Sequence, residues 1–274
     1  MAIHIHPTAV VDPGAELADG VVVGPHAVIG PRVEIGEGTE VGASCQIQGP
    51  TRIGRDNRLF PLGSFGLDPQ DLKYKGEETS LEIGDGNHFR EFCTIHRGTG
   101  EGGFTRIGSR GLYMVYSHIA HDCIVGDRVV FANNATLAGH VEVEDDVTIS
   151  AFSAVHQFCR VGCHAYVGGY TVVTMDALPY VKTVGQKATC YGLNTIGLRR
   201  KGFDAATLER LRAAMHILLR SGLNTAQALE RMAAEVAGSP EVDHLIAFVR
   251  SARRGVVKSL PGQRSSGRGG GGGE

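Results

Sequence analysis

The sequence predicts a mainly β fold: a parallel β-helix of hexapeptide repeats, followed by a small α-helical C-terminal domain. Glycine accounts for 39 of the 274 residues, about twice the usual share of roughly 7%. An aliphatic residue recurs at every sixth position through most of the chain, and helical patterning appears only after this repeat ends near Pro179. A period of six residues is typical of short strands that stack into successive coils.

The repeat starts at Ile5 and keeps one phase up to Val173. Each hexad predicts a short strand and a tight turn, and three hexads make one triangular coil of about 18 residues. We expect the aliphatic residue of each hexad to point into the coil, and the small or medium-sized fifth residue to be buried as well. Four cysteines hold this fifth position and are therefore predicted to be reduced core residues: Cys45, Cys93, Cys123 and Cys159.

Two insertions interrupt the repeat and leave its phase intact. Residues 65–82 form a polar stretch with proline and glycine, and residues 101–106 replace a single hexad. We predict that both are loops leaving the solenoid at a corner, and loops of this kind often carry binding function. Residues 1–190 are thus expected to form the β-helix domain.

The C-terminal part of the chain changes to helical patterning. Asp204, Asn224 and Ser239 each precede an amphipathic segment and are suited to cap a helix. We therefore predict an α-helical domain over residues 191–258. Residues 259–274 are rich in glycine and are predicted to be a disordered tail.

Composition and charge exclude several classes of function. The formal net charge is −2, which gives no reason to expect nucleic acid as a partner. There is no run of 18 apolar residues, and the N-terminus lacks the pattern of a secretory signal, so we expect a cytoplasmic protein without a transmembrane segment. Six cysteines without a CxxC pair argue against a disulfide framework and against structural zinc on thiolates.

The coil length brings a set of polar residues together at one corner. Residues one coil apart stack at about 4.8 Å, the spacing of neighbouring strands. The predicted cluster spans three coils: His121, Gly139 and Gln157 in one column, Asp122 and His140 in the next, His156 beside them, and His118 one strand-length before His121.

Three interpretations of this cluster stay open from the residues alone. In the first, neutral His121 is a general base, Asp122 stabilises its imidazolium form, and the N–H of Gly139 approaches an oxyanion. In the second, three histidines hold zinc, as in a β-helical carbonic anhydrase-like hydratase: His118, His121 and His140. In the third, the corner is structural and the solenoid only binds a partner. No nucleophile elbow and no phosphate-binding glycine loop occurs, which favours direct transfer over covalent catalysis.

Longer motifs identify a family. The segments IAHDCIVGDRVVFANNATLAGHVEVEDD (119–146) and AVHQFCRVG (154–162) closely resemble the acyl-[acyl-carrier-protein]–UDP-N-acetylglucosamine O-acyltransferases. So do DPQDLKYKGE in the long insertion and NTIGLRRKGF at 194–203. The resemblance extends to about residue 255.

The resemblance implies a left-handed parallel β-helix, a homotrimer with active sites between neighbouring subunits, and no cofactor. It also implies transfer of an R-3-hydroxyacyl chain from acyl carrier protein to the 3-hydroxyl of UDP-N-acetylglucosamine, the first step of lipid A biosynthesis. The sister enzymes that acylate the glucosamine amine carry an N-terminal globular domain, whereas this repeat already begins at Ile5. We therefore expect the O-acyltransferase.

Residue roles follow from the resemblance position by position. His121 would be the base, Asp122 its acidic partner and Gly139 the oxyanion donor. Sugar binding would fall to Gln70, Asp71 and Lys73, and substrate positioning to His118, His156 and Gln157. The remaining expected contacts are His140 with the nucleotide sugar or acyl chain, Gly169 with the acyl chain, and Asn194 and Arg200 with the uridine diphosphate.

Overall fold

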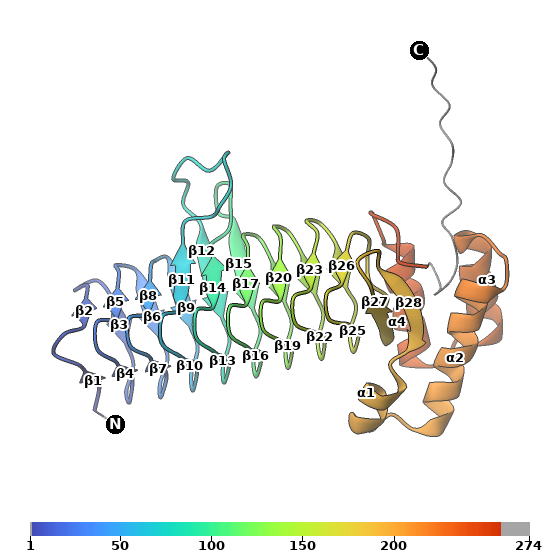
Figure 1. Ribbon diagram of the computed structural model, residues 1–274, viewed down its shortest axis with the longest axis horizontal. Coiled ribbons are helices and arrows are strands. Elements are labelled where there is room, and N and C mark those ends of the chain that lie inside the picture. The colour runs from blue at the N-terminus through green and yellow to red at the C-terminus, as the bar shows by residue number, and fades with distance from the viewer. Residues whose placement is uncertain (1, 259–274) are drawn as a thin grey trace, which may run out of the picture.

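The computed structural model describes residues 2–258 of the chain, so the predicted disordered tail, 259–274, lies outside the described residues. Most of the chain forms a triangular prism of short parallel strands, and four helices lie at its C-terminal end (Figure 1). The prism is a left-handed parallel β-helix, as predicted, and its three faces are sheets of 11, 9 and 8 strands.

From β1 to β26 every third strand belongs to the same face, and β27 and β28 extend the first sheet. The first sheet contains β1 (His4–Ile5), β4 (Val22–Val23), β7 (Glu40–Val41), β10 (Arg58–Leu59), β13 (His88–Phe89), β16 (Leu112–Tyr113), β19 (Val130–Phe131), β22 (Thr148–Ile149), β25 (Tyr166–Val167), β27 (Val181–Val184) and β28 (Thr189–Leu193). The second contains β2 (Val10–Val11), β5 (Val28–Ile29), β8 (Gln46–Ile47), β11 (Ser64–Leu67), β14 (Thr94–His96), β17 (His118–Ile119), β20 (Thr136–Leu137), β23 (Ala154–Val155) and β26 (Val172–Val173). The third contains β3 (Glu16–Leu17), β6 (Val33–Ile35), β9 (Thr51–Ile53), β12 (Ser80–Ile83), β15 (Phe104–Ile107), β18 (Ile124–Val125), β21 (Glu142–Val143) and β24 (Arg160–Val161).

The strand register confirms the predicted coil. His118 pairs with Thr136, and Thr136 pairs with Ala154, so successive coils are 18 residues apart. Ser64 pairs with Thr94 across the long insertion, and Thr94 pairs with His118 across the short one. The insertions therefore add residues outside the prism without shifting the inward-facing positions.

Apolar side chains fill the inside of the prism. An aromatic column runs through its middle, where the Phe89 ring stacks on Tyr113 at 4.6 Å and meets Phe65 edge-on at 5.3 Å. The four cysteines at the fifth hexad position are free and buried, as predicted. Burial raises the pKa of the Cys93 and Cys123 thiols to about 12, so both stay protonated at neutral pH.

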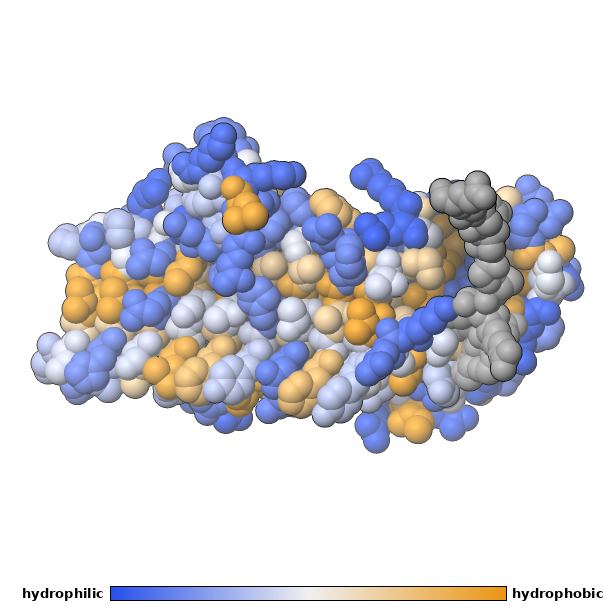
Figure 2. Space-filling model, turned by 45° about the horizontal axis from the view of Figure 1, so that its top comes forward, coloured by the Kyte–Doolittle hydropathy of each residue, from blue (hydrophilic) through white to orange (hydrophobic). Residues whose placement is uncertain are grey.

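The two inserted loops have different bounds from the predicted ranges. Phe65 lies in β11 and Leu81 lies in β12, and both side chains are fully buried. The expected range 65–82 is therefore too wide at both ends, because Phe65 still occupies the inward-facing phase. The short loop lies between β14, which ends at His96, and β15, which begins at Phe104, so the second half of the range 101–106 belongs to a strand. The remaining long loop leaves the prism between β11 and β12 and is largely hydrophilic (Figures 1 and 2).

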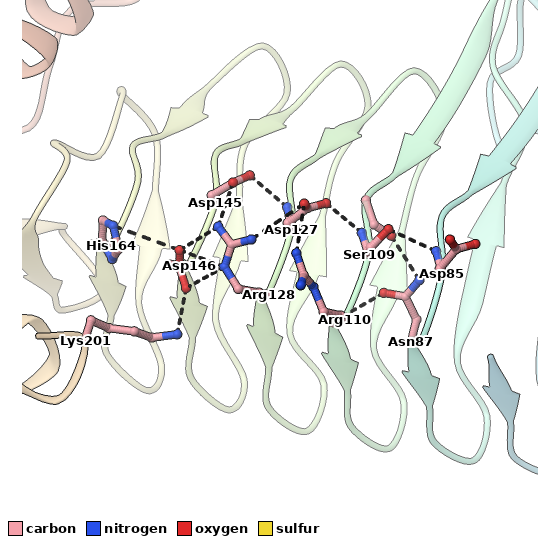
Figure 3. Close-up of polar contacts among 12 residues, drawn as sticks. Asp85, Asn87, Ser109, Arg110, Asp127, Arg128, Asp145, Asp146, His164 and Lys201 are labelled. Atoms are coloured by element: carbon pink, nitrogen blue, oxygen red, sulfur yellow. Dashed lines mark hydrogen bonds and ion pairs between the residues drawn. The ribbon is translucent and has the colours of Figure 1, made fainter. Parts of the chain in front are cut away.

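A polar ladder follows the corner between the third and first sheets (Figure 3). Oδ1 of Asp127 accepts the Ser109 N–H at 2.8 Å, and Oδ1 of Asp145 accepts the Asp127 N–H at 2.8 Å. These carboxylates satisfy turn N–H groups that no strand pairs. At the end of the ladder, Asp146 accepts from Lys201 at 2.6 Å and so joins the prism to the helices.

The C-terminal helices form their own apolar core. They are α1 (Thr195–Arg200), α2 (Ala205–Arg220), α3 (Thr225–Glu235) and α4 (Pro240–Arg250). The predicted caps Asp204, Asn224 and Ser239 each accept a backbone N–H from the first turn of α2, α3 and α4. The antiparallel pair β27–β28 is not predicted, and β28 extends to Leu193, beyond the expected start of the helical domain at residue 191. The short helix α1 lies within that domain, before the first predicted cap. No helix within residues 2–258 has the length and apolar character needed to cross a membrane.

Candidate active site

The corner between the second and third sheets holds the predicted histidine cluster. His121 follows β17, and its side chain is 13% exposed. Its ring lies directly over Gly139 on the next coil. A Cβ at position 139 would stand 2.5 Å from Cε1 and 2.7 Å from Nε2 of His121. Glycine is therefore required here by the close approach of the imidazole.

Asp122 orients the His121 ring. Nδ1 of His121 lies 2.7 Å from Oδ2 of Asp122, and the carboxylate is only 13% exposed. With Nδ1–H donating to the carboxylate, Nε2 carries the lone pair and can accept a proton. This arrangement matches a histidine general base held by an acidic partner.

Two threonines hold Asp122 in turn. The Thr99 N–H donates to Oδ1 at 2.9 Å, and the Thr99 hydroxyl donates to Oδ2 at 2.6 Å. The Asp122 N–H donates to Oγ1 of Thr105 at 2.9 Å. Neither threonine is predicted from the sequence as a site residue. Thr105 lies one coil before Cys123 in β15, although it falls within the range 101–106 that the sequence predicts to be an insertion. Thr99 lies between β14 and β15, where coil spacing gives no signal.

His140 forms one wall of the site. Its ring meets His121 edge-on with centroids 5.2 Å apart and stacks on Phe158, on the next coil, at 4.6 Å. Its Nε2 lies 3.5 Å from Oδ2 of Asp122. Asp122 and His140 have φ near 59°, which turns their side chains out of the prism at the corner. Phe158 is missed by the sequence analysis although it shares the column of His140.

His118 and a further histidine, His96, lie on the neighbouring strands β17 and β14, just before the corner that holds His121. Nδ1 of His118 lies 2.7 Å from Oγ1 of Thr94, and the His118 ring meets His96 edge-on at 5.2 Å. Burial, followed by the charges of His118 and His121, lowers the pKa of His96 to about 4. Burial and His121 also lower the pKa of His118. Both imidazoles are therefore neutral at neutral pH.

The long loop lies close to this corner. Asp71 and Lys73 line a hollow of about 310 Å³ together with Thr99 and His140. Gln70 lines a neighbouring hollow of about 470 Å³ with His96. The structure thus brings these three predicted loop residues beside the histidines.

Arg97 fixes the loop to the prism. Its guanidinium donates to the Gly66 carbonyl, to the Asp68 carboxylate and, at 3.1 Å, to the Tyr74 hydroxyl. The Arg97 side chain is 9% exposed, so the loop closes over it. Arg97 also lines the hollow that contains Gln70 and His96. Neither Arg97 nor His96 is predicted from the sequence.

Comparison with known proteins decides the family. The chain is 51% identical over 255 residues to acyl-[acyl-carrier-protein]–UDP-N-acetylglucosamine O-acyltransferases of Thiobacillus denitrificans and of Myxococcus xanthus. Each alignment covers 93% of this chain and 99% of the relative. The chain belongs to the acyl-[acyl-carrier-protein]–UDP-N-acetylglucosamine O-acyltransferase family.

Further comparisons agree with this assignment. A family model described as Udp N-acetylglucosamine O-acyltransferase, Domain 2, matches residues 176–257. The crystal structure of the Francisella novicida UDP-N-acetylglucosamine acyltransferase superimposes with a TM-score of 0.90 at 38% identity, covering 94% of this chain and 95% of that one. The Acinetobacter baumannii structure gives a TM-score of 0.87 at 43% identity, covering 92% and 99%. The protein is an acyltransferase, and the predicted family is confirmed.

Not all predicted residues of this acyltransferase meet at the corner. His156 and Gln157 are exposed on the coil after Gly139, where Nδ1 of His156 lies 3.1 Å from the Gln157 carbonyl. Gly169 is exposed beyond β25, and Arg200 is exposed at the end of α1. Asn194 caps α1 and donates to the His164 carbonyl at 3.1 Å. None of these five residues lines either of the two hollows beside the histidines.

The three-imidazole zinc site is not assembled in one chain. Among the described residues, the donor atoms of His121, Asp122 and His140 lie within 4.8 Å of one another, but His118 does not belong to this group. His118 instead contacts Thr94 and His96. The geometry therefore favours the acid–base interpretation of the cluster.

Proposed function

We propose that this acyltransferase moves an R-3-hydroxyacyl chain from acyl carrier protein to the 3-hydroxyl of UDP-N-acetylglucosamine, the first step of lipid A biosynthesis. The names of its relatives at about half identity support this choice of donor and acceptor. The single observation that carries the chemistry is the His121–Asp122 pair, 2.7 Å apart, with the His121 ring over Gly139.

In the proposed mechanism His121 acts first as a base and then as an acid. Its Nε2 accepts the proton of the sugar 3-hydroxyl while the hydroxyl oxygen attacks the thioester carbon. The Asp122 carboxylate stabilises the imidazolium that forms. The tetrahedral intermediate then breaks its C–S bond, and His121 returns the proton to the departing thiol. Cys123, the nearest thiol in sequence, is fully buried and protonated, so it offers no alternative nucleophile.

Gly139 is suited to stabilise the oxyanion of that intermediate. Among residues 2–258, no protein acceptor is found for its backbone N–H. The missing side chain leaves this N–H open to a substrate that also reaches Nε2 of His121. An N–H aimed at developing negative charge typically contributes about 3–4 kcal/mol to catalysis.

The loop and corner residues would bind the nucleotide sugar. We assign sugar contacts to Gln70, Asp71 and Lys73 because they line the hollows beside the histidines. Other proposed substrate contacts are His118, His140, His156 and Gln157. Gly169 would border the acyl chain.

Asn194 and Arg200 would serve the active site of a neighbouring subunit in a homotrimer. Both lie near the corner between the third and first sheets, whereas His121 lies between the second and third. If the first sheet of one subunit faces the second sheet of the next, these two corners border a shared cleft. Arg199 and Arg200 are exposed and can contact phosphate. Lys201 already pairs with Asp146.

We also propose a cytoplasmic location. All six cysteines are free in the structure, which suits a reducing compartment. The acyl carrier protein donor belongs to the same proposal, with the exposed arginines of α1 as contacts for its acidic surface.

A transfer assay tests the proposed reaction. Purified, chelator-treated enzyme is incubated with R-3-hydroxyacyl carrier protein of several chain lengths and UDP-N-acetylglucosamine. We expect one acylated product, with the ester on the 3-hydroxyl by NMR, and no loss of rate after metal removal. An amide product, or no transfer at any chain length, would contradict the proposal. Transfer that requires zinc would instead support a metal ion bound by His121, Asp122 and His140.

A further inference from the structure

A second cluster of metal-binding side chains lies away from the histidine corner, where α4 packs on the prism. It consists of Glu144, Cys163 and His244. One donor atom from each residue, a carboxylate oxygen, the thiol sulfur and a ring nitrogen, lies within 4.8 Å of the other two. No part of the proposed acyl transfer uses these residues.

The fold positions two of the three donors rigidly. Glu144 follows β21 and Cys163 follows β24, and these strands pair directly through Glu142 with Arg160. The Cys163 N–H donates to Oε2 of Glu144 at 2.7 Å, which fixes the carboxylate beside the cysteine. Donors held by paired strands lose little freedom when a ligand binds.

His244 brings the third donor from the helical part of the chain. It lies in α4, and its Nε2 stands 2.8 Å from Oε2 of Glu144. The helix is anchored by Arg160, which donates to the Phe248 carbonyl at 2.8 Å. The charge of Arg160 is balanced by the buried Asp176 carboxylate at 2.9 Å, so it does not leave an uncompensated positive charge beside the cluster.

We propose that Glu144, Cys163 and His244 bind a divalent cation of the zinc type and so tie α4 to the β-helix. One sulfur, one nitrogen and one oxygen donor form a set that zinc accepts at about 2.0–2.3 Å. In a tetrahedral site these donors would lie roughly 3.3–3.8 Å apart, so small side-chain rotations complete the geometry. Water would hold the fourth position.

Binding of the cation displaces two protons from the three ligands. The cation replaces the proton shared between His244 and Glu144, and the Cys163 thiol releases its own proton on becoming a ligand. The Glu144 and His244 side chains are 33% and 37% exposed, which leaves a path for the ion. The three ligands come from separate elements of the fold, so no local spacing of the CxxC type predicts this site from the sequence.

Cobalt(II) is the probe that separates this site from the histidine corner. The full-length, chelator-treated protein is titrated with Co²⁺, and the near-ultraviolet sulfur-to-cobalt charge-transfer band is followed. We expect one equivalent of Co²⁺ to give this band together with the intense visible bands of a tetrahedral site. The group at the corner contains His121, Asp122 and His140 and no thiol, so cobalt bound there gives no such band.

Two variants and a control make the test specific. Cys163→Ser should abolish the charge-transfer band, and His244→Asn should weaken cobalt binding by at least about 10-fold. His216→Asn, at an exposed position of α2, should bind cobalt like the wild type. Zinc should raise the Tm of the wild type and of His216→Asn more than that of His244→Asn. No charge-transfer band, a band that survives Cys163→Ser, or an equal Tm increase in all proteins would overturn the proposal.

Discussion

Thr99 sets the orientation of the proposed base through the carboxylate of Asp122. Through its N–H and hydroxyl it donates to both oxygens of Asp122, and Asp122 in turn orients His121. We predict that Thr99→Val lowers kcat by about 10- to 100-fold, because a hydrogen bond to a charged group contributes about 1.5–3 kcal/mol. Thr99→Ser should restore most of the rate, since it keeps the hydroxyl. Steady-state kinetics measure kcat for both variants, and Tm shows whether either variant has lost stability. An unchanged kcat in Thr99→Val would show that Asp122 does not depend on this bond.

His96 makes stability depend on pH. Its pKa of about 4 in the fold lies below the ordinary value of 6.5 because of burial and the neighbouring His118 and His121. The unfolded chain therefore binds the proton more tightly, and stability present above pH 6.5 is lost as the pH falls toward 4. We predict that His96 alone contributes a loss of about 2 kcal/mol in the free energy of unfolding between pH 7 and pH 5.

Urea unfolding at several pH values measures this loss. His96→Gln should show a smaller decrease than the wild type over the same pH range, whatever its stability at pH 7. Identical slopes would contradict the assignment of a neutral, buried imidazole at position 96.

The inserted loop depends on one buried arginine. Arg97 binds the Gly66 carbonyl, Asp68 and Tyr74, so it connects the loop to the prism. We predict that Arg97→Met, which keeps the apolar stem, raises the KM for the nucleotide sugar by about 10-fold through loss of loop order. Trypsin should also cleave faster after Lys73 and Lys75. Arg106→Met is the control, because the exposed Arg106 side chain pairs with Glu82 and lies over the Phe104 ring, and both of these residues belong to strands of the third sheet. Equal cleavage of both variants would contradict an anchoring role for Arg97.

Elements differ in how well the sequence predicts them. The six-residue period predicts the strands of the β-helix, and the column of His121 and Gly139, because every coil repeats the same geometry. The three C-terminal caps predict α2, α3 and α4. Contacts made by insertions follow no period, so Thr99 and Arg97 are not predictable in this way, whereas His96 ends β14 and lies within the repeat. The Cys163–His244 contact joins the prism to a helix and depends on tertiary packing alone.

An exposed aromatic column at the corner between the first and second sheets is relevant to assembly. Tyr116, Phe152 and Tyr170 are 52%, 53% and 66% exposed, and Phe152 stacks on Tyr170 at 5.2 Å. Exposed apolar columns of this kind mark interaction surfaces. In the proposed trimer this corner lies at the threefold axis, because the first and second sheets face neighbouring subunits.

Sedimentation tests this arrangement. We predict a mass of three chains for the wild type and dissociation with loss of activity for the double variant Phe152→Asp, Tyr170→Asp, since six carboxylates would meet at the axis. Leu72→Asp, a charge placed on the exposed loop, should leave the mass unchanged. A monomeric wild type, or a double variant that keeps the mass of three chains, would contradict the proposed assembly.

In the proposed mechanism His121, oriented by Asp122 over Gly139, is the general base of acyl transfer. The most direct test compares kcat for His121→Ala and wild type, in metal-free buffer with saturating acyl carrier protein and nucleotide sugar. His216→Asn on α2 serves as a folded control. We expect His121→Ala to lose at least about 100-fold in kcat, the size typical of a lost general base, while the control keeps full activity. An undiminished kcat in His121→Ala would contradict the claim and point to His140 as the base.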